Sequence, residues 1–122
     1  MTCCKDHQAR MKMSSDPQHH CSLEGLERKI VQWHHDRNLI EGATDKDQFA
    51  KLIQEAGELS DNLCKGRSPA DDIGDMIVVL INIAERNGLT LNQCMTQAWD
   101  DIKDRKGKMV DGVFIKESDI DG

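Results

Sequence analysis

The sequence has few aromatic residues: it contains no tyrosine, two phenylalanines and two tryptophans among 122 residues. Since hydrophobic residues still make up 38% of the chain, we expect one compact domain with a mainly aliphatic core. No apolar run approaches the ~18–20 residues that a membrane span requires. The longest run, Met76–Ile81, predicts a core segment. The amino terminus has charged residues but no apolar stretch behind them, so we expect no secretory signal.

Positive charge is also scarce, because 16 Lys and Arg residues stand against 22 Asp and Glu residues, a net charge of −6. This balance argues against a surface that follows nucleic-acid phosphates, and an acidic domain that binds anions needs cations to do so. The five cysteines are an odd number with irregular spacing and no CxxC pair, which indicates reduced thiols. We therefore expect a cytoplasmic protein, in the host cytoplasm if a phage encodes it, with no nucleic-acid or membrane partner.

Residues 1–22 are rich in Ser, His, Gln and charged residues and show no apolar periodicity. This composition predicts a flexible amino-terminal arm before a domain that covers 23–122. The arm contains six residues that could bind a soft metal, but their spacing matches no zinc module, so a plain tail is favoured. These residues are Cys3, Cys4, His7, His19, His20 and Cys21.

Four helices are predicted from apolar residues that recur at three- and four-residue steps. Each of the last three begins with a Ser or Thr that can cap the first turn. The third helix is apolar nearly all round, so it must be central or lie in a subunit interface. The expected helices are about 23–37, 44–65 with Thr44 and Asp47 as a capping box, 68–88 beginning at Ser68-Pro69, and 90–105 with Thr90 and Gln93 as a capping box.

Beyond the last helix, the pair Asp111-Gly112 stands between two short β-prone runs, which predicts a two-residue hairpin. The predicted fold class is therefore all-α: a four-helix bundle with a short C-terminal β-hairpin. A chain of this size buries only part of its apolar surface by itself, so we expect an oligomer.

Two pairs of carboxylates stand out, Glu55 with Glu58 on the second helix and Asp72 with Asp75 on the third. The three-residue spacing places the members of each pair on one side of their helix, and the short link between the helices lets the pairs face each other. Four carboxylates at a core edge repel unless they are protonated or bridged by cations, and oxygen ligands suit Mg²⁺ or Mn²⁺. The alternative is a solvated acidic face and a helix start favoured by its dipole. Asp75 fits that alternative poorly, because mostly apolar residues follow it.

These motifs resemble those of the MazG-like, all-α nucleoside triphosphate pyrophosphohydrolases, most closely the small phage-encoded members. The resemblance spans about 26–116 and rests on four blocks in the family's order. That family usually has Glu where this chain has Asp72, so the shorter side chain would bind through water or with help from Asp71. The four blocks are His34–Leu39, Glu55-Ala-Gly-Glu58-Leu, Asp72-Ile-Gly-Asp75-Met and Ile102–Lys108.

The resemblance implies Mg²⁺-dependent hydrolysis of a nucleoside triphosphate to the monophosphate and pyrophosphate, with Mn²⁺ able to substitute. It implies that all four carboxylates bind metal and that Glu55 or Glu58 also orients or deprotonates the attacking water. It further implies a dimer or tetramer, and small phage members lead us to favour a purine deoxynucleotide, dGTP or dATP. The residues expected at the substrate are His34 against the nucleobase, Trp33 by stacking unless it packs in the core, Asn38 unless it only forms a turn, and Lys103, Arg105 and Lys106 at the phosphates.

A second hypothesis is a non-catalytic helical interaction module whose acidic residues are only solvated. The position of Asp75 before an apolar run favours the enzyme.

Overall fold

The structure is a computed structural model that describes residues 22–120, so residues 1–21 of the predicted arm, with all six cysteine and histidine candidates, lie outside the described residues. The chain divides into two compact units, Met1–Leu91 and Asn92–Gly122. The mainly helical fold and the C-terminal hairpin are confirmed. Within 22–120, no helix is long and apolar enough to cross a membrane.

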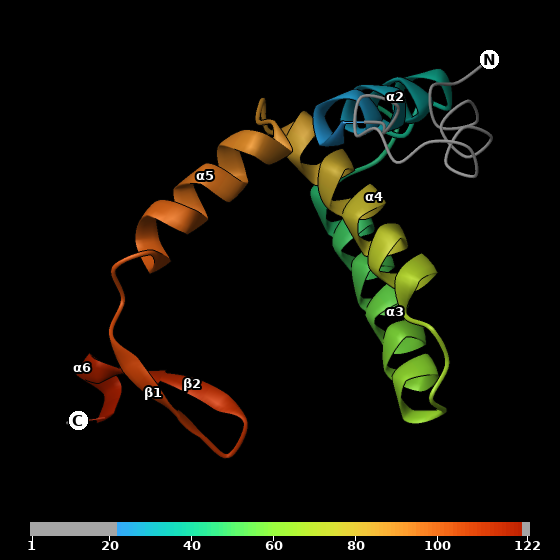
Figure 1. The fold of residues 1–122 in the computed structure, drawn as a ribbon. Helices are drawn as coiled ribbons and strands as arrows, with labels where there is room; N and C mark the ends of the chain where they lie inside the picture. The colour runs from blue at the N-terminus through green and yellow to red at the C-terminus, as the bar shows by residue number, and fades with distance from the viewer. Residues whose placement is uncertain (1–21, 121–122) are drawn as a thin grey trace, which may run out of the picture. The chain divides into compact units, whose positions relative to one another are not determined.

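The first unit contains three helices: α2 (Leu23–Asp36), α3 (Asp45–Cys64) and α4 (Ala70–Arg86) (Figure 1). Helix α4 packs against both α2 and α3. Helices α3 and α4 are antiparallel, because the start of each lies near the end of the other. Arg86 Nε lies 2.8 Å from Asp45 Oδ1, and Asn62 Nδ2 lies 2.7 Å from Asp72 Oδ2.

Helix α3, which carries both glutamates, begins at the predicted capping box. The Asp47 amide donates to Thr44 Oγ1 over 3.1 Å, and the Thr44 amide donates to Asp47 Oδ2 over 3.0 Å. Hydrogen bonds to the Asp47 carboxylate from the backbone amide and from the side chain of Thr44 lower the pKa of Asp47. The prediction for α4 was wrong by one residue: Pro69 is the N-cap, and Ser68 Oγ accepts a bond from the Ala70 amide over 3.3 Å.

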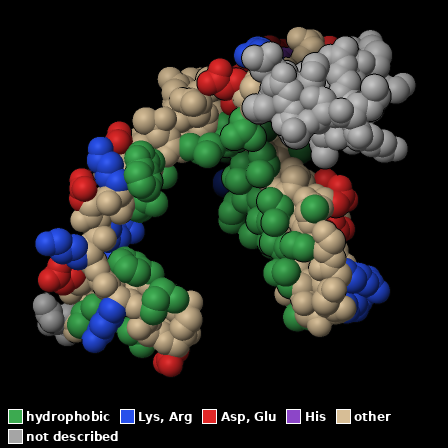
Figure 2. All heavy atoms as spheres, in the orientation of Figure 1, with side chains coloured by type: hydrophobic (Ala, Val, Ile, Leu, Met, Phe, Trp, Pro, Cys, Tyr) green, Lys and Arg blue, Asp and Glu red, His purple; other side chains and the backbone are tan. Residues whose placement is uncertain are grey.

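The core of the first unit is small and is built around α4. The buried hydrophobic residues are Ile40, Val79, Ile81 and Ala84, and three of the four belong to α4. Within the first unit, one face of the α3–α4 pair is apolar and exposed (Figure 2). Its members recur at helical spacing, and we call them the α3–α4 apolar stripe: Phe49, Ile53 and Leu63 on α3, and Ile73, Ile77 and Leu80 on α4.

The second unit begins with the second residue of α5 (Leu91–Ile102) and also contains a hairpin and the short helix α6 (Glu117–Ile120), which was not predicted. Helix α5 ends before the predicted Arg105, and the strands β1 (Gly107–Val110) and β2 (Val113–Lys116) pair antiparallel. Asp111 and Gly112 have φ of 51° and 83°, the positive values that a two-residue hairpin turn requires, so this prediction is confirmed. The four predicted helices exist, but α5 belongs to a different unit from α2, α3 and α4.

Candidate metal centre and adjoining pocket

Three of the four predicted carboxylates come together on α3 and α4. Glu55 and Glu58 lie one turn apart on α3, and Asp75 lies on α4. One oxygen from each lies within 4.8 Å of the other two, and in the part of the chain that the structure describes this is the group of His, Cys, Asp or Glu side chains that could hold a metal ion. We call these residues the carboxylate triad.

The most buried member of the triad is Glu55, which is 7% exposed. Its Oε1 lies 3.1 Å from Lys51 Nζ, while its buried Oε2 has no hydrogen-bond partner among residues 22–120. A buried carboxylate oxygen without a partner is costly, and a cation or a proton would remove that cost. The donor set of the triad consists of oxygen atoms alone, so it fits Mg²⁺ or Mn²⁺.

The negative charges of the triad carboxylates affect one another's pKa values. Glu58 can bond to Glu55 only when a proton is shared, and this bond, with the charge of Glu55, raises the pKa of Glu58. Burial, together with the charges of Asp71, Glu55 and Asp72, raises the pKa of Asp75. Both shifts are those expected of crowded carboxylates, and a bound divalent cation would oppose them.

Asp72, the fourth predicted ligand, lies outside the triad. It is 5% exposed, and its Oδ2 accepts a hydrogen bond from Asn62 Nδ2 over 2.7 Å. Asn62 was not among the predicted site residues, although its spacing in the sequence gives a signal. Asn62 follows Glu58 by four residues and therefore shares its face of α3.

His34 is buried, with 2% of its surface exposed, so its predicted contact with a nucleobase needs correction. Its Nε2 lies 2.9 Å from the Val78 carbonyl oxygen and must carry the hydrogen there. Its Nδ1 accepts a bond from Asn82 Nδ2 over 3.2 Å, and Asn82 Nδ2 also donates to the Leu39 carbonyl over 3.0 Å. His34 therefore fastens α2 to α4.

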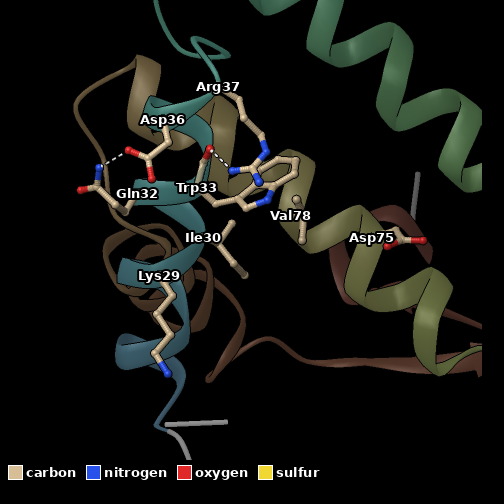
Figure 3. A pocket seen from close by; sticks show the side chains of 8 residues that line it. All are labelled: Lys29, Ile30, Gln32, Trp33, Asp36, Arg37, Asp75 and Val78. Carbon is tan, nitrogen blue, oxygen red and sulfur yellow. Dashed lines mark hydrogen bonds between the residues drawn. The ribbon is translucent and has the colours of Figure 1, made fainter. Parts of the chain in front are cut away.

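A pocket of about 720 Å³ lies between α2 and α4 (Figure 3). Trp33, which is 43% exposed, forms an aromatic wall, and the Arg37 guanidinium carbon lies 4.3 Å from the centre of its ring. Ile30 and Val78 add apolar surface, and Asp75 lines the pocket as well as belonging to the triad. Trp33 is thus a pocket residue and not a core residue.

Asn38 is exposed and has a φ of 55°, and its carbonyl accepts a bond from the Gly42 amide over 3.2 Å. A side chain on Gly42 would collide with Asn38, so this tight turn requires glycine at position 42. The turn also accounts for the positive φ of Asn38. Of its two predicted roles, the structure places Asn38 in the turn.

The predicted phosphate-binding residues belong to the second unit. Lys103 Nζ lies 3.3 Å from Asp100 Oδ1. Arg105 and Lys106 line a shallow pocket of about 460 Å³ together with Lys116. Their role at the phosphates stays a prediction from the resemblance.

The chain is 42% identical over 67 residues to an uncharacterized 18.2 kDa protein from the rep-hol intergenic region of Haemophilus phage HP1 (strain HP1c1). The match covers 53% of this chain and 41% of that protein, so the chain spans less than half of the relative's length. No protein family model and no solved structure matches the sequence.

Proposed function

We propose that this protein hydrolyses a nucleoside triphosphate to the monophosphate and pyrophosphate with a divalent cation held at the carboxylate triad. The observation that carries the proposal is the double position of Asp75, which belongs both to the triad and to the pocket walled by Trp33. A single ligand could therefore place a planar ring in the pocket while its phosphates approach the triad.

The carboxylates alone would repel a triphosphate. A bound Mg²⁺ or Mn²⁺ would offset that charge and acidify water near the scissile bond. The water oxygen would form a bond to the α-phosphorus as the bond from the α-phosphorus to the bridging oxygen of pyrophosphate breaks. Glu55 or Glu58 would orient the attacking water or accept its proton.

The pocket suits the nucleobase because the Trp33 ring offers an apolar face and Arg37 already lies over it. His34 would act through its neighbours in this arrangement, since its ring contacts α4 and lies edge-to-face with Trp33, with 5.2 Å between ring centres. The resemblance adds Lys103, Arg105 and Lys106 as partners of the phosphates.

The likeness to an uncharacterized phage protein supports a phage context alone. The resemblance to small phage-encoded pyrophosphohydrolases leads us to propose a role in nucleotide-pool control in the host cytoplasm, with purine deoxynucleotides as substrates. We also propose a dimer or tetramer, since a second copy would cover the α3–α4 apolar stripe. That stripe equally suits the alternative, a non-catalytic interaction module, which needs no cation.

A panel of eight ribo- and deoxynucleoside triphosphates with Mg²⁺ tests the proposed reaction. We expect pyrophosphate as the product, and at least ~100-fold less activity for Asp75→Asn or after EDTA. Asp61→Asn is the matched control, because Asp61 is an exposed carboxylate on α3 outside the triad. Release of orthophosphate, or substantial activity in Asp75→Asn, would contradict the proposal.

A further inference from the structure

The side chain of Arg37 covers one face of the aromatic wall of the pocket. Its guanidinium carbon lies 4.3 Å from the centre of the Trp33 ring. Trp33 and Arg37 extend from α2 towards α4, whereas Gln32 and Asp36 point to the other side of α2 (Figure 3). A planar ligand can therefore stack on this face of Trp33 only when Arg37 moves away from it.

The contacts that hold Arg37 on Trp33 are few and weak. Its Nη1 donates to the Trp33 carbonyl oxygen over 3.3 Å, which is a long hydrogen bond to a neutral acceptor. Within residues 22–120, no ion pair includes Arg37, although the whole chain has a net charge of −6. Arg37 is exposed, and a cation–π contact contributes little at an exposed site. Arg37 can therefore exchange Trp33 for another partner at low cost.

The two carboxylates that line the pocket do not supply that partner. Asp36 Oδ1 accepts a hydrogen bond from Gln32 Nε2 over 2.7 Å, and Asp75 belongs to the carboxylate triad. The pocket thus combines an aromatic face, a guanidinium group without an ion-pair partner in the described chain, and an edge shared with the triad. A ligand that suits the first two features carries both a planar ring and an anionic group.

We infer that Arg37 is a phosphate-binding residue that leaves Trp33 when a nucleotide enters the pocket. The inference rests on the proposed function, because a nucleoside triphosphate supplies both replacements at once. Its base takes the place of the guanidinium group on the Trp33 ring, and its phosphates give that group an anionic partner. An uncharged nucleoside supplies only the base, so it has to displace Arg37 without compensation.

Binding to the full chain without turnover tests this role. Trp99→Phe leaves Trp33 as the only tryptophan, and α,β-methylene-dATP with Mg²⁺ cannot be hydrolysed between its α- and β-phosphorus atoms. We expect Arg37→Gln to weaken binding of this analogue at least ~10-fold and not to weaken binding of deoxyadenosine. Arg37→Lys keeps the charge without the planar fork and should restore part of the affinity. Arg28→Gln is the matched control, because Arg28 is an exposed cation of α2 outside the pocket.

Inorganic tripolyphosphate separates the displacement of Arg37 from stacking, because it carries the charge of the nucleotide without a ring. With Mg²⁺, it should change the emission of Trp33 in the Trp99→Phe protein by drawing Arg37 away from the indole. Arg37→Gln should show the changed emission before any ligand is added, and tripolyphosphate should then have no effect. Circular dichroism confirms that the variants remain helical.

The outcomes separate this inference from the proposed function. Equal losses of affinity for the analogue and for deoxyadenosine in Arg37→Gln, or no loss for the analogue, would overturn the phosphate-binding role and leave the enzyme proposal standing. A tripolyphosphate effect on emission that is absent from the parent protein, or that persists in Arg37→Gln, would overturn the displacement. Failure of the parent protein to bind the analogue would overturn both proposals.

Discussion

Among the single residues, Asp75 carries the largest conflict between stability and proposed function. Burial and three neighbouring carboxylates raise its pKa, so its charged form is disfavoured in the folded protein. The same residue connects the triad to the pocket. A site that would be stabilised by a cation is thus destabilised by repulsion in the metal-free protein.

Asp75→Asn should therefore stabilise the metal-free protein. The folded state binds a proton at Asp75 more tightly than the unfolded state, so the charged side chain costs stability above its raised pKa. This cost shrinks as the pH falls towards the ordinary value near 3.8. We expect a gain of roughly 0.5 kcal/mol near neutral pH, or about 2–4 °C in Tm, which declines in acid. Thermal melts with EDTA at several pH values measure it.

Addition of Mn²⁺ should reverse the order of the two proteins. A cation present at about one hundred times its Kd stabilises the wild type by about 2.7 kcal/mol, while Asp75→Asn should gain little. A wild-type Tm that Mn²⁺ does not change would contradict the metal centre and favour the interaction module.

Trp33 allows the pocket to be tested by fluorescence. The chain has two tryptophans, so Trp99→Phe leaves Trp33 as the reporter. We expect a nucleoside triphosphate with Mg²⁺ to change its emission, because the base would stack on the exposed ring. Trp33→Leu should raise KM about 10-fold, equivalent to about 1.4 kcal/mol, with a smaller change in kcat. Trp99→Leu is the matched control, and equal effects of the two variants would contradict the pocket.

At the scale of helices and strands, the sequence predicted those features that depend on residues close together in the chain. The capping box at Thr44 and the turn at Asp111-Gly112 depend on residues within one turn of each other, and both are confirmed. The boundaries of α5 and the start of α4 shifted by a few residues, because several backbone groups can satisfy a helix end. Helix α6 has four residues, too few to show any periodicity.

The candidate metal centre and pocket were predictable only in part. Spacing in the sequence shows which residues share a face of a helix, but not which side chains of other helices they contact. The spacing of Glu55, Glu58 and Asp75 agrees with the triad. Asp72 lies three residues before Asp75, as Glu55 lies three before Glu58, but its carboxylate accepts a hydrogen bond from Asn62 on α3. The resemblance implies that His34 contacts the nucleobase, yet its ring is buried and hydrogen-bonds with Val78 and Asn82, more than forty residues away in the chain.

The capping box of α3 should support the triad through stability and not through chemistry. Thr44→Ala removes the acceptor for the Asp47 amide and should cost about 1 kcal/mol, or about 4–8 °C in Tm. Because Glu55 lies three turns further along α3, we expect kcat to change by less than ~2-fold. Thr44→Ser keeps the hydroxyl and should restore the Tm. A large loss of kcat at a temperature where the variant is folded would contradict this separation.

At the scale of the whole molecule, the described chain leaves more large apolar side chains exposed than it buries. The buried hydrophobic core of residues 22–120 consists of four residues, while the α3–α4 apolar stripe alone contains six side chains that are 37% to 56% exposed. The prediction that the third helix is central or lies in an interface agrees with the burial on α4. The opposite face of this helix, α4, is apolar but exposed, so we expect another surface to bury it.

We expect a second copy of the chain to provide this cover. Burying a side chain that is about half exposed contributes about 1 kcal/mol, so a stripe of this size can hold a symmetric pair together. Sedimentation at micromolar concentration should give two or four times the chain mass of 13.8 kDa. Ile53→Glu should shift the protein towards the single-chain mass, because it places a charge in the middle of the α3 part of the stripe. Leu23→Glu is the matched control, since Leu23 is a 71% exposed residue on α2 outside the stripe. A 13.8 kDa wild-type species, or equal dissociation by both variants, would exclude the stripe as the interface.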